Sequence, residues 1–200
     1  MKLFINQTSP YARKARVVAH ETGAVITLVD VDPWNDPPEL LAVSPLSKVP
    51  VLVAENDLVL TESDTITRYL AALDTSHKLL PADALAQNEM AARTAMAQGM
   101  IDAAFDAVIE KRRPAVNQWP EWVERQRRAV RRGLEWVATQ PHTTNRFDLG
   151  DVSLACLLGY LDFRHPTLAW RVAHPGLAAW FDQVSQRPSL AATNPDLPIA

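Results

Sequence analysis

The sequence has few of the features that mark specialised protein classes. Its 200 residues include one cysteine, Cys156, which excludes an intrachain disulfide and favours a reducing compartment. Cys156 lies in an apolar stretch, so we interpret it as a buried core thiol rather than a nucleophile. No apolar run reaches the ~20 residues of a transmembrane helix, and the N-terminal segment turns polar at Asn6, too early for a signal peptide. The sequence therefore predicts a cytoplasmic protein that does not enter the membrane.

Motifs for metal and nucleotide chemistry are also missing. The five histidines show no H-E-x-x-H or Cys/His spacing, and the six glycines form neither a G-x-G-x-x-G motif nor a P-loop. A G-x-S-x-G nucleophile elbow is absent as well. The net charge of -3 gives no basic excess for a nucleic-acid footprint. We therefore expect no metal and no nucleic-acid partner.

The basic residues are unevenly distributed, with a cluster between Lys111 and Arg132. This segment has helical signals, and several of its charges lie four residues from a charge of opposite sign, which favours a solvated, salt-bridged helix face. An anion-binding surface is the alternative. The predicted ion pairs are Glu121 with Arg125, Glu124 with Arg128, and Arg131 with Glu135.

Residues 1 to 80 mix strand and helix signals in the order βαβαββα, which predicts an α/β domain over residues 1–75. The first strand, helix and second strand imply a parallel pair with a right-handed crossover. The second strand is apolar enough to be buried on both faces, and Thr61 is placed to cap the last helix. The predicted strands are Lys2 to Asn6, Ile26 to Val31, Val49 to Val53 and Leu58 to Leu60, with helices from Pro10 to Gly23, over Glu39 to Val43 and after Thr61.

Residues 84 to 190 carry helical signals only, which predicts an all-helical domain over residues 84–200, and residues 76–83 form the predicted linker between the two domains. Asp148 and Asp151 give a strong helix-start signal, since Asp148 can cap the first turn and Asp151 suits its positive end. The helix that follows is apolar almost all round, which predicts the buried centre of this half. The predicted helices are Ala84 to Arg113, Glu121 to Thr139, Asp148 to Leu161 and Pro175 to Gln186.

Ser9 lies at the first predicted junction between a strand and a helix. The N-terminus of a helix presents unpaired N–H groups and a positive field, which favour a thiolate or another anion. Pro10 is suited to the first helical position, and the Ser9 hydroxyl could donate to an anionic sulfur. The simpler interpretation is that Ser9 only caps the helix.

Two further segments carry polar groups that suit a peptide-like ligand. Pro50 either marks the edge of a strand or forms a cis bond with Val49, which would turn the backbone of Val49 toward an extended peptide. The second segment is a helix start at Glu62 and Ser63, which offers a hydroxyl and N–H groups for an anion beside a carboxylate for an ammonium group.

Taken in order, these segments resemble the glutathione S-transferase superfamily over essentially the whole chain. The resemblance implies a thioredoxin-like N-terminal domain over residues 1–75 and an all-helical bundle over residues 84–200. Two segments, Gly99 to Ala104 and Gly159 to Arg164, resemble the bacterial YibF type. The other matching segments are Ser9 to Lys14, Ser44 to Leu52, Thr61 to Leu70, Asp148 to Asp151, and the C-terminal Pro175, Trp180 and Arg187 to Ser189.

The resemblance implies an enzyme that binds glutathione as a co-substrate and conjugates it to a small hydrophobic electrophile. Ser9 would hydrogen-bond the thiolate, with Tyr11 as the alternative donor, and Lys48 would meet the glycyl carboxylate. The remaining glutathione-binding residues would be Val49 with Pro50, which pair with the cysteinyl backbone, and Glu62 with Ser63, which hold the γ-glutamyl end.

The chain departs from the family pattern at three serines. Ser44 and Ser47 replace the usual asparagine and glycine before Lys48, and Ser9 replaces the cysteine of thioltransferase-type relatives, so mixed-disulfide chemistry has no protein nucleophile. The alternative to a transferase is a non-catalytic protein with the glutathione S-transferase fold, which would bind glutathione or another ligand or have a regulatory role. A glutathione-dependent isomerase or dehalogenase would share the same binding site.

The acceptor site is expected near the long helix that starts at Ala84 and the loop that follows the first strand. Its candidate residues are Trp34, Met100, Phe105 and Arg112, each of which could instead serve packing or be merely exposed. The resemblance also implies a homodimer, in which Asp102 would face a glutathione site.

Overall fold

The computed structural model describes residues 1–74 and 79–196, which form two compact units. The first unit comprises Met1–Gln87 and the segment from Pro188 onward; the second is Asn88–Arg187. Positions 76–78 of the predicted linker lie outside the described residues. In the described part of the chain, no helix is long and apolar enough to cross a membrane.

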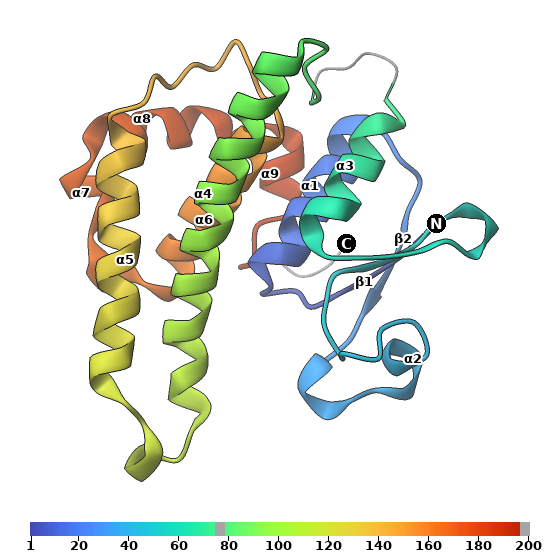
Figure 1. The fold of residues 1–200 in the computed structure, drawn as a ribbon, viewed down its shortest axis with the longest axis horizontal. Coiled ribbons are helices and arrows are strands. Elements are labelled where there is room, and N and C mark those ends of the chain that lie inside the picture. Colours follow the sequence, from blue (N-terminus) through green and yellow to red (C-terminus); the bar gives the residue numbers. More distant parts are fainter. Residues whose placement is uncertain (75–78, 197–200) are drawn as a thin grey trace. The chain divides into compact units, whose positions relative to one another are not determined.

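The first unit is built on a four-stranded mixed sheet in the order β2-β1-β3-β4 (Figure 1). Strand β1 (Lys2–Ile5) runs parallel to β2 (Thr27–Asp30) and antiparallel to β3 (Val51–Val53), which pairs with β4 (Val59–Thr61). The parallel pairing of β1 with β2 confirms the predicted parallel pair. The predicted burial of the second strand on both faces is wrong: β2 is an edge strand, and its end residues are exposed.

Helices cover both faces of this sheet. Helices α1 (Pro10–Thr22) and α3 (Ser63–Ala72) lie side by side on one face, and α9 (Pro188–Ala192) contacts α1 (Figure 1). On the other face, Leu40 of the short helix α2 (Pro38–Leu41) packs in a buried cluster with the sheet residues Phe4 and Val51. The βαβαββα order and the α/β class of the N-terminal region are therefore confirmed.

The ends of α1 follow the predicted signals. The Ser9 hydroxyl accepts from the N–H of Ala12, and Pro10 occupies the first helical position. Gly23 ends the helix in the left-handed region, with φ of 67°, where glycine has no Cβ penalty. The start of α3 differs from the prediction: Thr61 ends β4, and Glu62 takes the N-cap position without a side-chain cap bond.

The second unit is helical. Gly133 of α5 allows close approach of α4, because an added Cβ would lie 2.2 Å from the Met100 sulfur. Helix α6 is buried along most of its length, and the Asp148 capping box is confirmed. Its helices are α4 (Ala84–Ile109), which enters the unit at Asn88, α5 (Pro120–Ala138), α6 (Leu149–Arg164), α7 (Trp170–Ala173) and α8 (Pro175–Val184).

Three sequence expectations for the helical region are corrected by the structure. The long helix ends at Ile109 rather than Arg113, because the chain tightens into a 3-10 turn over Glu110–Arg112. The short helices α7 and α9 were not predicted, since four or five residues carry little periodicity.

Arg131 pairs with Glu124 at 2.7 Å and not with Glu135, and the other two predicted pairs are not among the ion pairs of the described residues. Further 3-10 turns lie at Pro33–Asn35, Glu55–Asp57, Ala115–Asn117 and Pro166–Leu168.

Candidate functional site

The register of the sheet brings the three predicted site segments to one end of the first unit. Phe4 of β1 pairs with Val51 of β3, and Val51 pairs with Thr61 of β4. The chain leaves β1 toward Ser9 at this end, and it also leaves β4 toward Glu62 here. The residues that precede Val51 lie at the same end. The candidate catalytic and glutathione-binding residues are therefore gathered by strand pairing.

Ser9 is half-buried at the N-terminus of α1. Its Oγ accepts from the N–H of Ala12 at 3.2 Å, which leaves its hydroxyl hydrogen for a further acceptor. Asn6 orders the preceding loop, because its Oδ1 accepts from both the N–H and the hydroxyl of Thr8. Its Nδ2 donates to the carbonyl of Val31 at 3.2 Å, which ties the loop to the residue after β2. The first turn of α1 holds no acidic residue, so the helix field favours an anion beside Ser9.

The segment before β3 contains a cis bond between Val49 and Pro50. Among the described residues, neither the N–H nor the C=O of Val49 takes part in a backbone hydrogen bond. Pro50 is buried and Lys48 is exposed. The backbone of Val49 is therefore able to pair with an extended ligand, and the Lys48 ammonium group lies in solvent beside it in the chain.

The two unusual serines build the turn before Lys48. Ser47 adopts the left-handed conformation with φ of 49°, at the position where the related pattern has glycine. Its N–H donates to the carbonyl of Ser44 at 2.9 Å, and its hydroxyl donates to the carbonyl of Pro33 at 2.8 Å. The Ser44 hydroxyl donates to the carbonyl of Lys48 at 3.4 Å. Side-chain bonds therefore hold a turn in which the backbone conformation favours glycine.

The start of α3 presents the second set of polar groups. Glu62 is exposed and has φ of 66° and ψ of 128°, a conformation that L residues rarely adopt. Ser63 is buried at the first helical position. The N–H groups of the first turn have no acceptor within the helix, and the N–H of Ile66 is the first to bond, to the carbonyl of Glu62. An anion can bind these N–H groups, while the Glu62 carboxylate can accept from a cation.

An ion pair between a buried lysine and a half-exposed aspartate joins the helices that carry Ser9 and Ser63. Lys14 on α1 has no exposed side-chain surface, and its Nζ lies 2.5 Å from Oδ1 of Asp64 on α3. Neither residue was predicted to take part in the site, because the alanines and valines of α1 were the residues that indicated its buried face. A lysine four residues after the first helical position gives no sequence signal for burial, since lysine is mostly exposed.

Helix α1 is also tied to the C-terminal helix of the same unit. The guanidinium group of Arg13, which is buried, donates to the carbonyl of Leu190 at 3.1 Å. The hydroxyl of Ser189 donates to the carboxylate of Glu21 at 2.5 Å. These contacts fix α1 along its length, which restricts the position of Ser9 at its end.

The candidate acceptor residues differ in exposure. Trp34, in a 3-10 turn of the first unit, is 52% exposed. Met100 is 3% exposed and packs against Gly133, so little of its side chain is accessible. The other candidates are Tyr11 and Phe105, which are half-buried, and Asp102 and Arg112, which are exposed.

Two carboxylates lie one turn apart on α4. Asp102 accepts a hydrogen bond from Gln98 at 2.9 Å. Partial burial, together with the nearby charge of Asp102, raises the pKa of Asp106.

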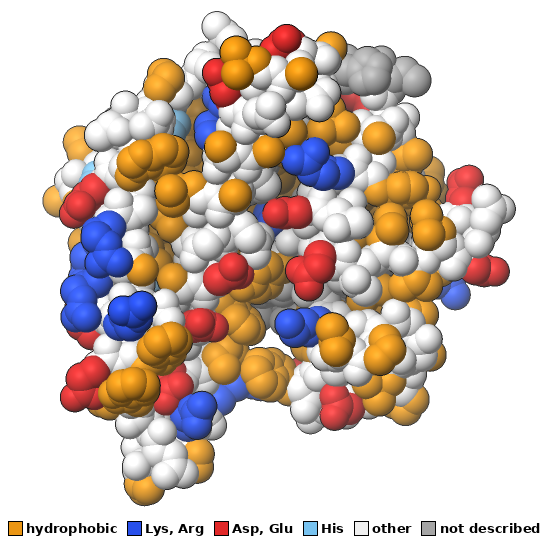
Figure 2. Space-filling view, in the orientation of Figure 1, with side chains coloured by type: hydrophobic (Ala, Val, Ile, Leu, Met, Phe, Trp, Pro, Cys, Tyr) orange, Lys and Arg blue, Asp and Glu red, His pale blue; other side chains and the backbone are white. Residues whose placement is uncertain are grey.

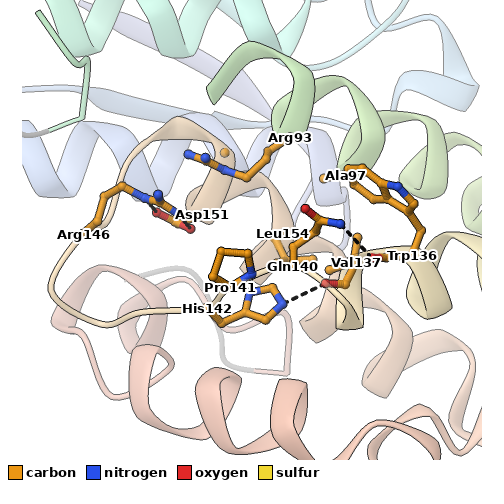
Figure 3. A pocket seen from close by; sticks show the side chains of 11 residues that line it. Arg93, Ala97, Trp136, Val137, Gln140, Pro141, His142, Arg146, Asp151 and Leu154 are labelled. Carbon is orange, nitrogen blue, oxygen red and sulfur yellow. Dashed lines mark hydrogen bonds and ion pairs between the residues drawn. The ribbon is translucent and has the colours of Figure 1, made fainter. Parts of the chain in front are cut away.

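A small cavity of about 20 Å³ lies in the second unit (Figure 3). Its volume suits about one water molecule, so we interpret it as part of the packing around the start of α6. Arg146 and Asp151 point toward one another there, and burial with the charge of Asp148 raises the pKa of Asp151. The lining residues include Arg93, Trp136, His142, Arg146 and Asp151.

An open groove of about 630 Å³ lies between α4 and α5. Its lining is mostly small or apolar, with Arg132 as the charged member. Figure 2 shows Lys and Arg side chains along the α5 side of this face. Within the described residues, no group of three or more His, Cys, Asp or Glu side chains is placed to hold a metal ion.

Comparison with known proteins gives matches over both units. Residues 8–73 match the family model of the glutathione S-transferase N-terminal domain, and residues 120–183 match that of the C-terminal domain. The chain is 31% identical to an uncharacterised GST-like protein, YibF, from Escherichia coli (strain K12), and the alignment covers 98% of each chain.

Solved structures resemble the chain over nearly its full length. A glutathione transferase family member from Pseudomonas fluorescens Pf-5 with bound glutathione is 37% identical, with a TM-score of 0.91 over 98% of this chain and 99% of that one. A glutathione S-transferase from Methylobacillus flagellatus KT with glutathione bound is 35% identical, with a TM-score of 0.90 over 97% and 98%. These matches confirm the fold and the resemblance found in the sequence.

Proposed function

The chain belongs to the glutathione S-transferase family, and on that basis we propose that it binds glutathione in its first unit and promotes attack of the thiolate on a small electrophile. The observation that supports this most directly is the sheet register, which brings Ser9, Val49 and Ser63 to one end of the sheet. The relatives with bound glutathione support the same ligand.

Glutathione would bind as an extended peptide along this end of the sheet. The N–H and C=O of Val49, next to Pro50, would pair with the cysteinyl backbone. Ser63 and the first-turn N–H groups of α3 would hold the γ-glutamyl carboxylate, and Glu62 would accept from its ammonium group. Lys48 would meet the glycyl carboxylate.

Ser9 would act on the sulfur by donating a hydrogen bond to the thiolate. Its hydroxyl oxygen already accepts from the N–H of Ala12, so its hydrogen is available to another acceptor. Such a bond stabilises the thiolate over the thiol and lowers its pKa, at about 1.4 kcal/mol for each pKa unit. The protein need not supply the nucleophile, because the co-substrate carries it. The Ser9 side chain cannot form a mixed disulfide, which argues against a thioltransferase.

The acceptor would be a small hydrophobic electrophile. We propose Tyr11, Trp34, Phe105 and Arg112 as residues that contact it, with Met100 as a minor contributor because it is buried. Conjugation would serve detoxification. The identity of the electrophile depends on side chains at loop and helix ends, which vary most among relatives of one fold.

We also propose a homodimer in the cytoplasm. The groove between α4 and α5 supports an interface, because small side chains such as Ala95 and Gly99 allow close approach of another chain. In such a dimer, Asp102 would face a glutathione site. The single cysteine, Cys156, is buried, which fits a reducing compartment.

Calorimetry with glutathione, followed by thiolate absorbance across pH on the same sample, tests the proposal. We expect saturable binding and a bound thiol whose pKa is below that of free glutathione. Binding with an unchanged thiol pKa would contradict catalysis and would favour a non-catalytic glutathione-binding protein. No binding at millimolar glutathione, checked by the absence of a thermal shift, would overturn the proposal as a whole.

A further inference from the structure

Lys14 is a buried cation whose partner is a half-exposed carboxylate. The Lys14 side chain is 0% exposed, whereas that of Asp64 is 40% exposed. Burial of a charge is costly unless it is paired, and apolar residues of similar volume usually stabilise a fold as well as a buried pair does. Stability alone therefore does not explain why a lysine occupies this position, which points to a role for its charge.

The location of Asp64 indicates what that role is. Asp64 directly follows Ser63 in the first turn of α3, where the backbone N–H groups are directed at the proposed γ-glutamyl carboxylate. An unpaired carboxylate here would repel that anion and would oppose the attraction of the helix N-terminus. The 2.5 Å contact with Lys14 places a positive charge directly against Asp64.

We propose that Lys14 is a positioning residue of the glutathione site that acts through Asp64. Its charge neutralises the Asp64 carboxylate, so that the start of α3 retains its affinity for the γ-glutamyl carboxylate. Lys14 itself does not contact the ligand, because its side chain is fully buried. This inference rests on the proposed binding of glutathione. It assigns a role in that binding to the Lys14 ammonium group, which does not contact the ligand.

The contact also fixes the distance between two ligand-binding helix ends. Lys14 lies five residues after Ser9, and Asp64 lies one residue after Ser63. Helices α1 and α3 pack against each other. The Lys14–Asp64 pair therefore links α1, which carries Ser9, to α3, which carries Ser63. Because the two charges are opposite, the link adds no net charge to the proposed site.

The test compares glutathione affinity in the wild type, Lys14→Met and the double variant Lys14→Met/Asp64→Asn by calorimetry. Methionine is unbranched and only one heavy atom shorter than lysine, and the double variant has no charge at either position. We expect Lys14→Met to weaken binding about fivefold, the size expected for a like charge near the surface, and the loss to shrink at high salt. The double variant should bind within about twofold of the wild type, because the repulsion from the Asp64 carboxylate is removed.

The outcomes separate this inference from the proposed function. If the wild type binds glutathione but Lys14→Met binds it equally well, the role of Lys14 is overturned and the function stands. The role is also overturned if the double variant remains as weak as Lys14→Met, because a purely structural loss would not be rescued by removing the Asp64 charge. If Lys14→Met does not fold, Lys14→Gln replaces it, since glutamine can still donate a hydrogen bond to Asp64. Failure of the wild type to bind overturns the function itself.

Discussion

The Ser47 hydroxyl donates to the carbonyl oxygen of Pro33 at 2.8 Å, and it does so from a left-handed backbone conformation with φ of 49°. A non-glycine residue in this region costs about 1 kcal/mol, and a hydrogen bond contributes about the same in return. The two effects therefore nearly cancel at Ser47. This explains how the turn before Lys48 forms without the glycine of the related pattern.

Two substitutions at Ser47 should have different effects on the free energy of unfolding. Ser47→Ala keeps the backbone strain and loses the hydrogen bond to Pro33, so we expect it to destabilise the protein by about 1 kcal/mol. Ser47→Gly loses the same bond but removes the strain, so its stability should stay within about 0.5 kcal/mol of the wild type. Urea unfolding of the two variants measures the difference. Equal stabilities for the two would show that the left-handed conformation carries no cost here.

Ser9→Ala should separate capping from chemistry. We expect a loss of stability of about 1 kcal/mol, because the cap of α1 is removed. Glutathione should still bind, but the pKa of the bound thiol should rise toward that of free glutathione, since the hydroxyl no longer donates to the sulfur. Thiolate absorbance in the complex across pH measures this shift.

Tyr11→Phe is the matched control for Ser9→Ala. It removes a hydroxyl group from the first turn of the same helix and leaves the capping bond between Ser9 and Ala12 in place. It should leave the pKa of the bound thiol unchanged. If Tyr11→Phe raises that pKa and Ser9→Ala does not, then Tyr11 is the hydroxyl donor and Ser9 is only a helix cap.

Glu62→Gln should weaken glutathione binding without unfolding the protein. The substitution keeps the size of an exposed side chain but removes the negative charge that would accept from the γ-glutamyl ammonium group. Loss of one charge-assisted bond predicts about a tenfold higher dissociation constant. Calorimetry measures it, with Glu55→Gln as a control in an exposed turn of the same unit. An equal effect of both substitutions would indicate a change in overall charge rather than a contact with the ligand.

Local signals in the sequence were sufficient for the order of elements in the first unit. Ser9, Pro10 and Gly23 predicted both ends of α1, because capping depends on neighbours within one helical turn. Asp148 and Asp151 predicted the start of α6 for the same reason. The failures came where tertiary contacts decide, as at β2, which is apolar enough for a central strand but lies at the edge.

The candidate site was predictable as segments but not as an arrangement. Nothing near Lys14 in the sequence identifies Asp64, 50 residues later, as its partner, because that contact depends on the packing of α1 against α3. The positive φ angles of Ser47 and Glu62 were equally hidden, since neither residue type favours them. Helical periodicity placed Met100 on the apolar face of the long helix, but it could not distinguish a residue that packs in the core from one that contacts a ligand. In the structure Met100 is buried.

His165 gives the second unit a defined response to acid. His165 is buried, with 3% of the residue exposed. Its Nε2 lies 2.9 Å from the carbonyl oxygen of Ala104. Because a carbonyl oxygen can only accept, Nε2 carries the hydrogen. Burial lowers the pKa of His165 from 6.5, and the positive charges of Arg127 and Lys111 lower it further, although the bond to Ala104 opposes them. The folded protein therefore holds a neutral imidazole at pH values where the unfolded chain is protonated.

We expect the free energy of unfolding to be independent of His165 above pH 6.5 and to fall as the pH drops below it, toward the lowered pKa of the folded state. In that window the unfolded chain binds one more proton, which gives a slope of up to about 1.4 kcal/mol per pH unit. His165→Gln can still donate to Ala104, and it should flatten this slope at a cost of about 1 kcal/mol at neutral pH. Urea unfolding between pH 7.5 and pH 5 measures both effects. The control His20→Gln, at an exposed position, should retain the wild-type slope. If His165→Gln also retains it, acid sensitivity arises from other groups.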